Sequence, residues 1–116
     1  MIFTDNAGVQ HRIVCGSLRK VNGTWTVVND SINEPSDLSI GTVTSTSIQV
    51  LFPASPQMEK FIVGVDATFA GAHTVSFGGN VGISSASIRG RVDGGPFNPL
   101  TWSESGAIRI DGLFRV

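Results

Sequence analysis

Few residues in this sequence could do acid–base or nucleophilic chemistry, and their spacing fits none of the common catalytic motifs. His11 and His73 are the two imidazoles, and neither has a second histidine at the H-x-H or H-x-x-x-H spacing of a metal site. The G-x-S-x-G motif of serine hydrolases is absent, so a Ser–His–Asp triad would have to be assembled in space. We expect both histidines to be solvated or hydrogen-bonded and the protein not to be an enzyme. A hydrolase using His11 or His73 is the least favoured alternative.

Candidate sites for a metal or a cofactor are equally weak. Asp30, Glu34 and Asp37 are close in the sequence, but they do not follow the D-x-[DN]-x-[DN]-G pattern of a calcium loop. The stretch GGNVG at 78–82 lacks the lysine of a phosphate-binding loop, and no helical pattern follows it. Cys15 is the single cysteine and lies in the apolar run RIVCG, which predicts a buried thiol. We expect no cofactor and no bound metal.

The aromatic residues offer one further chemistry, the stacking of a sugar ring. The chain has seven Phe and two Trp but no Tyr, whereas sugar-binding surfaces commonly use both Tyr and Trp. Trp25 alternates with Thr24 and Thr26 in a β pattern, so we expect its ring on the core face with Val27. Trp102 follows the stretch GGPFNPL, and its ring could cover a sheet edge or meet a partner.

The composition indicates a small and nearly neutral protein. Of 116 residues 15% are charged, below the roughly 25% of typical soluble domains, and the formal net charge is −1. A surface of Ser, Thr, Asn and Gly is suited to packing against another protein, and the scattered cations argue against nucleic-acid binding. No apolar run approaches the ~18 residues of a membrane helix, and Asp5 interrupts the start where a signal peptide would be apolar. We expect a soluble product made in the cytoplasm, without membrane insertion.

Short runs rich in Val, Ile, Thr and Phe alternate with turn residues along the chain, and no segment has helical periodicity. This pattern predicts an all-β fold: a single-domain antiparallel β-sandwich, or a small barrel, of about seven to eight short strands over residues 1–116. Residues 1–9 are expected to form a short lead, and the glycine-rich stretches 77–82 and 90–102 to interrupt the strands. We expect strands at 10–21, 24–29, 39–44, 47–52, 60–69, 84–92 and 106–116.

Alternation along two of these strands predicts part of the core. The residues expected to face inward are Ile48, Val50, Phe52, Phe61, Val63, Val65, Ala67 and Phe69. Asp66 falls on the opposite face of its strand, so we expect its carboxylate to face solvent.

Three residue pairs predict two-residue hairpin turns, because each pair tolerates the positive φ angles that such turns need. They are Asn22-Gly23, Asp93-Gly94 and Asp111-Gly112. The third pair predicts that residues 106–116 form a C-terminal hairpin, with Ile108 and Ile110 facing the core.

Four stretches, taken in order, give the chain a resemblance to a known family. They read NGTWTVVNDSINEP at 22–35, IGTVTSTSIQVLF at 40–52, FIVGVDATFA at 61–70 and GGNVGISSASI at 78–88. In this order they resemble a small β-domain of structural proteins from tailed bacteriophages that infect actinobacteria, of the minor tail or tail-fibre type. The resemblance implies a non-enzymatic virion protein and supplies no catalytic residue.

The resemblance also sets the expected partners. We expect a homo-oligomer, a trimer as the resemblance suggests, that contacts other virion proteins on the tail and uses the pairing tendency of β-sheets under symmetry. The alternatives are a capsid decoration protein of the same class of virion and a monomeric module that binds host-surface carbohydrate through Trp25 or Trp102. The side chains expected at partner contacts are Phe97, Leu100, Trp102, Leu113 and Phe114.

Overall fold

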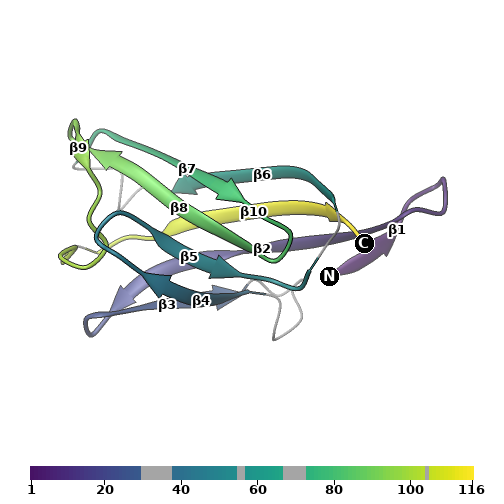
Figure 1. Ribbon diagram of the computed structural model, residues 1–116, viewed down its shortest axis with the longest axis horizontal. Coiled ribbons are helices and arrows are strands. Elements are labelled where there is room, and N and C mark those ends of the chain that lie inside the picture. Colours follow the sequence, from purple (N-terminus) through teal and green to yellow (C-terminus); the bar gives the residue numbers. More distant parts are fainter. Residues whose placement is uncertain (30–37, 55–56, 67–72, 104) are drawn as a thin grey trace.

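The computed structural model describes residues 1–29, 38–54, 57–66, 73–103 and 105–116. Within these ranges the chain has no helix, and its strands form two antiparallel five-stranded sheets that pack as a β-sandwich (Figure 1). Both sheets are open, so the all-β sandwich prediction is confirmed in preference to a barrel. The strands are β1 (Ile2–Thr4), β2 (Gln10–Val21), β3 (Thr24–Asn29), β4 (Ser39–Val43), β5 (Ile48–Leu51), β6 (Gln57–Val65), β7 (Val75–Val81), β8 (Ser85–Val92), β9 (Gly95–Pro96) and β10 (Ile108–Arg115).

The first sheet, here called sheet A, is centred on the long strand β2 and the C-terminal strand β10. β10 lies between β2 and β6, while the other edge of β2 pairs with β1 at one end and β3 at the other. The second sheet, sheet B, has the order β4–β5–β8–β7, and short β9 also pairs with β8. Residues 1–12 extend beyond sheet B as an arm, the β1–β2 arm (Figure 1).

The core lies between the two sheets, and the described residues that alternation placed there are found there: Ile48, Val50, Phe52, Phe61, Val63 and Val65. Ala67 and Phe69 lie outside the described residues. Trp25 is buried with Val27 packed against the same core, as predicted for this strand. The Cys15 thiol is also buried, as its apolar run predicted.

Two of the three predicted hairpin turns are confirmed. Asn22-Gly23 joins β2 to β3 with φ angles of 51° and 79°, and Asp93-Gly94 joins β8 to β9 with 52° and 82°. The C-terminal hairpin is wrong: β10 runs without a turn through Asp111-Gly112, because β2 and β6 pair with it along both sides. Ile108 and Ile110 are buried in the core, as expected.

Phenylalanine rings explain why segments with glycine form strands here. A Cβ on Gly112 would lie 2.7 Å from Phe114 Cε2, and a Cβ on Gly79 would lie 2.8 Å from Phe61 Cε1. A ring that covers a strand glycine replaces the apolar contact that its missing side chain would make. β7 therefore continues through its glycines to Val81, and the prediction that the stretch 77–82 interrupts the strands is wrong for all of it except Gly82.

The remaining differences concern strand number and ends. Ten strands form among the described residues instead of seven or eight, because β1 pairs with the start of β2, β7 runs through its glycines and β9 pairs with β8. No strand was predicted in the lead 1–9, but β1 occupies part of it. β6 begins at Gln57 and ends at Val65, earlier than the predicted 60–69.

Candidate functional site

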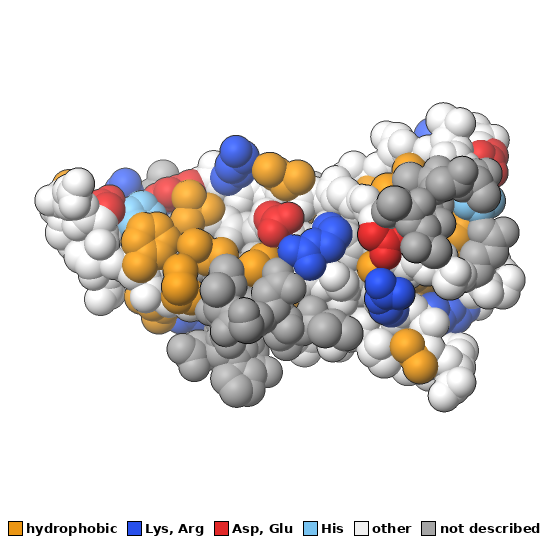
Figure 2. All heavy atoms as spheres, turned by 180° about the vertical axis from the view of Figure 1, so that it is seen from behind, with side chains coloured by type: hydrophobic (Ala, Val, Ile, Leu, Met, Phe, Trp, Pro, Cys, Tyr) orange, Lys and Arg blue, Asp and Glu red, His pale blue; other side chains and the backbone are white. Residues whose placement is uncertain are grey.

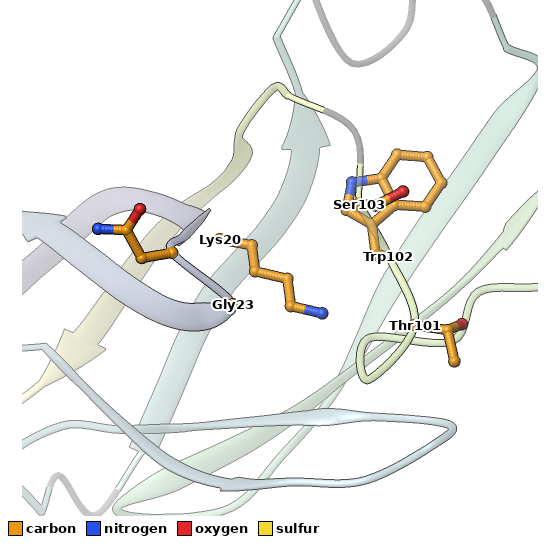
Figure 3. A pocket seen from close by; sticks show the side chains of 6 residues that line it. Lys20, Gly23, Thr101, Trp102 and Ser103 are labelled. Atoms are coloured by element: carbon orange, nitrogen blue, oxygen red, sulfur yellow. The ribbon is translucent and has the colours of Figure 1, made fainter.

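The end of the sandwich opposite the β1–β2 arm carries a polar cleft beside a tryptophan. The cleft has a volume of about 370 Å³ and lies between the β2–β3 turn and the segment 97–103. Figure 3 shows Lys20 reaching from the turn side toward the segment that carries Trp102. We call it the Trp102 cleft, and its lining residues are Lys20, Asn22, Gly23, Thr101, Trp102 and Ser103.

The segment that carries Trp102 is fixed by hydrogen bonds from β2 and β3. Lys20 Nζ donates to the carbonyls of Pro99 at 3.0 Å and Leu100 at 2.8 Å. Trp25 Nε1 donates to the same Pro99 oxygen at 2.9 Å in a buried contact. Two of the three ammonium donors are therefore used within the chain, and Lys20 holds this segment in place more than it offers a charge to a ligand.

Trp102 is further held by a cluster of rings. Phe97 lies at its centre, with ring centroids 5.9 Å from Trp25, 5.1 Å from Phe77 and 5.3 Å from Trp102, all in edge-to-face geometry. The His73 ring contacts Trp102 from another direction at 5.5 Å. Such contacts orient aromatic rings. Trp102 is therefore half-buried and held in one orientation beside the cleft.

A second hollow of about 310 Å³ shares Trp102 with the cleft and contains a His–Asp pair. His73 Nδ1 lies 2.7 Å from Asp93 Oδ2, and the Thr74 amide donates to Asp93 Oδ1 at 2.9 Å. The hydrogen bond from His73, followed by that from Thr74, lowers the pKa of the Asp93 carboxyl below its ordinary value. A catalytic triad would also need a serine hydroxyl on the second ring nitrogen. His73 contacts Asp93 and Trp102, so it supports the Asp93-Gly94 turn and the Trp102 ring.

The other histidine forms a similar pair in the β1–β2 arm. His11 is buried, its Nε2 lies 2.7 Å from Asp5 Oδ2, and the Phe3 ring stacks on it with centroids 5.0 Å apart. Its Nδ1 lies 3.0 Å from Glu59 Oε1, close enough for an ion pair although outside hydrogen-bond geometry. The hydrogen bond from His11, then the amides of Val9 and Ala7, lower the pKa of the Asp5 carboxyl. Both histidines lie in hydrogen-bond contact with an aspartate, which is one of the two states that we expected for them, solvated or hydrogen-bonded.

The outer face of sheet A carries a separate, apolar groove of about 250 Å³. Residues paired across antiparallel strands point to the same face, and Leu113 pairs with both Ile13 and Lys60, while Asp111 pairs with Ile62. Figure 2 looks onto this face, where apolar side chains gather toward the end with the arm and charged side chains lie beyond them. We call it the sheet A groove, and its lining residues are Ile13, Lys60, Ile62, Asp111, Gly112 and Leu113.

The five residues predicted as partner contacts divide between surface and core. Phe97 is 2% exposed and Phe114 is 1% exposed, so the prediction that these two rings meet a partner is corrected. Phe97 is enclosed by the other aromatic rings, and the inward residues of the central strand β10 are covered by sheet B. Leu100 is exposed, Trp102 lines the cleft and Leu113 lines the groove.

Sequence reasoning missed the groove, although one signal for it was present. Ile62 alternates with the core residues Phe61 and Val63, so alternation places an isoleucine on the solvent face. Asp66 falls on that same face, as predicted, and its carboxylate pairs with Arg19 at 3.3 Å. The proximity of Ile62 to Asp111 depends on strand register, which no sequence signal supplied.

Within the described ranges no group of three or more His, Cys, Asp or Glu is placed to hold a metal ion. Asp30, Glu34 and Asp37, the carboxylates weighed for calcium, lie outside those ranges. The described part of the chain contains no helix long and apolar enough to cross a membrane. Comparison of the chain with protein families, with curated proteins and with solved structures gives no match.

Proposed function

We propose that the chain is a non-enzymatic structural protein of a bacteriophage virion, a small tail-associated β-domain that works through protein–protein assembly. The observation that carries the proposal is the sheet A groove, where Ile62 is 48% exposed beside Ile13 and Leu113. An exposed apolar strip on a sheet face is typical of an assembly contact. The virion part of the proposal comes from the resemblance of the stretches between 22 and 88 to phage structural domains.

Exposed apolar side chains near the arm add to this surface. Phe3 stacks on His11 and remains partly exposed, and Ile2, Met58 and Val116 are also exposed. These residues come from β1, from β6 and from the C-terminus, so three parts of the chain contribute apolar area at one end of the molecule. A protein that works alone gains nothing from this exposure, whereas an assembling one buries it.

The first test is the mass of the protein in solution. A single chain has a mass of 12.2 kDa, and light scattering over a wide concentration range is expected to give a multiple of it. The resemblance favours a multiple of three. A mass of one chain at every concentration would contradict assembly of the chain with itself.

The location in the virion is tested by gold-labelled antibodies on particles that contain the chain. Label on the tail is the expected result. Label spread over the head would instead support the alternative, a capsid decoration protein, which would use the same assembly surface.

The Trp102 cleft favours one alternative function, binding of host-surface carbohydrate. Its lining combines an indole ring with the neutral polar groups of Asn22, Thr101 and Ser103, which suit a sugar that carries hydroxyls and no charge. A Trp102→Ala variant that keeps its fold and loses binding to host cell-wall polysaccharide would favour this alternative. Leu100→Ala, an exposed change in the same segment, is the matched control. Loss of the oligomer in Trp102→Ala would favour assembly.

A further inference from the structure

We infer that the sheet A groove is a two-fold contact between two copies of this chain, in which Lys60 of each copy pairs with Asp111 of the other. The inference rests on the proposed function, because it names the surface through which the chain assembles with itself. Its basis is the strand register of β6 and β10, which arranges two apolar and two charged side chains in a pattern that complements itself.

The pattern consists of two neighbouring cross-strand pairs. Lys60 on β6 pairs with Leu113 on β10, and two residues further along, Ile62 pairs with Asp111. All four side chains line the groove. The apolar residues therefore occupy one diagonal of a four-residue block, and a cation and an anion occupy the other diagonal.

A two-fold axis along the apolar diagonal brings each of the four side chains against a complementary side chain of the second copy. Such an axis lies in the contact plane and places Ile62 against Ile62 of the second copy and Leu113 against Leu113 of the second copy. The same rotation exchanges the two charged corners, so Lys60 meets Asp111 of the second copy and the reverse. This is an isologous contact, in which the same patch is used by both subunits.

The angle at which sheet A of one copy crosses sheet A of the other also belongs to a known class of sheet packing. Strands are about 4.8 Å apart and two residues along a strand span roughly 6.8 Å, so the diagonal is oblique to the strands. Rotation about an oblique axis makes the strands of the two copies cross at a large angle, close to the orthogonal class of sheet packing.

The charges of Lys60 and Asp111 indicate that a second copy of the chain binds the groove. A partner surface of one sign would leave either Lys60 or Asp111 facing a like charge, whereas a second copy presents both signs in exchanged positions. Both residues are exposed in the single chain, where Asp111 Oδ1 pairs with Arg109 Nη2 at 3.7 Å on the same strand. A two-fold contact gives a dimer, or a hexamer when combined with the three-fold symmetry that the resemblance suggests.

Charge reversal tests the pairing directly. In Lys60→Asp the contact faces carboxylate against carboxylate, and in Asp111→Lys it faces ammonium against ammonium. Each variant alone is expected to associate at least tenfold more weakly than the wild type, as measured by light scattering. An equimolar mixture is expected to restore association, because one subunit then supplies two anions and the other two cations. The double variant K60D/D111K is expected to associate with itself.

Apolar substitutions give a second measurement with a matched control. Ile62→Ser is expected to weaken association, while Ile83→Ser, at an isoleucine 65% exposed between β7 and β8, is expected to leave it unchanged. Circular dichroism on every variant checks that the sandwich is retained.

The outcomes separate the inference from the proposed function. A wild-type oligomer that both charge reversals leave intact would overturn the two-fold contact and leave assembly standing. Charge reversals that weaken association without rescue in the mixture would also overturn the Lys60–Asp111 pairing. A wild-type protein that stays a single chain at every concentration would overturn the two-fold contact and assembly of the chain with itself, and would leave assembly with other virion proteins to be tested by the antibody label.

Discussion

The two ends of the sandwich each hold a histidine paired with an aspartate at 2.7 Å, yet the surroundings of the two pairs differ. His11, in the β1–β2 arm, has Glu59 of β6 beside its second ring nitrogen and the Phe3 ring stacked on it. His73 lies against Trp102, and its aspartate belongs to the Asp93-Gly94 turn. His11 therefore also contacts a third strand, β6, while His73 supports a turn beside a cleft.

The difference shows that the same pair of residue types can contribute unequally to the stability of the fold. The His11–Glu59 contact ties the arm to the rest of sheet A, because Glu59 comes from β6 on the far side of β10. His11 is 7% exposed, so water has little access to its ring. Asp93 is a partly exposed side chain that also accepts from Thr74, and water can replace part of what His73 supplies.

The largest expected effect comes from replacing the two histidines in turn. His11→Ala leaves the carboxylates of Asp5 and Glu59 near each other without the ring between them, and we expect it to lower the free energy of unfolding by about 2–3 kcal/mol. His73→Ala removes one hydrogen bond and one ring contact and is expected to cost about 1 kcal/mol. Urea unfolding followed by circular dichroism measures both values.

The conservative variants His11→Gln and His73→Gln are the controls, since they keep a side-chain donor. Equal losses for His11→Ala and His73→Ala would contradict the distinction between the two ends.

A smaller effect, which disappears in acid, is expected from replacing Asp5 or Asp93. The pKa values of Asp5 and Asp93 are lower in the folded chain than the ordinary 3.8, so both ionised carboxylates stabilise the fold above that pH. This contribution is lost as the pH falls below 3.8 toward the folded pKa values. Asp5→Asn and Asp93→Asn should therefore be less stable than the wild type at pH 6, and the difference should shrink below pH 3.8. Thermal unfolding at a series of pH values measures it, and a difference that does not vary with pH would refute the assignment.

The smallest effect is expected from the ring that covers His11. Phe3→Leu keeps an apolar side chain and removes the stacking, so the cost should be about 0.5–1 kcal/mol. A truncation at an unrelated exposed position, Leu100→Ala, should have no measurable effect on unfolding. If the Phe3 variant matches the wild type, the stacking contributes nothing to the arm.

Much of the fold could be predicted because the signals for it are local. Alternation identified the inward residues of β5, and the Asn22-Gly23 and Asp93-Gly94 pairs identified two turns. Asp111-Gly112 has the same composition as those turns but lies inside β10, since strands on both sides pair with it. Pairing with two strands that are distant in the sequence therefore overrides the local preference of Asp111-Gly112 for a turn.

The candidate sites were less predictable. Trp102 and Leu113 were expected at contacts and do line the cleft and the groove, but Phe97 and Phe114 are core residues. Apolar character in a loop or at a chain end does not by itself distinguish a buried ring from an exposed one. The rest of the groove depends on which residues of β6 and β10 are neighbours.

The sequence by itself determined that this protein is all β, which residues of several strands face inward and where two of its turns lie. These properties follow from the period of side-chain alternation and from the φ preferences of Asn, Asp and Gly, which neighbouring residues decide. The tertiary structure alone decided that glycines covered by phenylalanine rings continue β7 and β10, that His11 lies between two carboxylates, and that Lys60, Ile62, Asp111 and Leu113 form one patch. Each of these depends on the register between strands far apart in the sequence, and register is fixed only when the strands pair and the two sheets pack together.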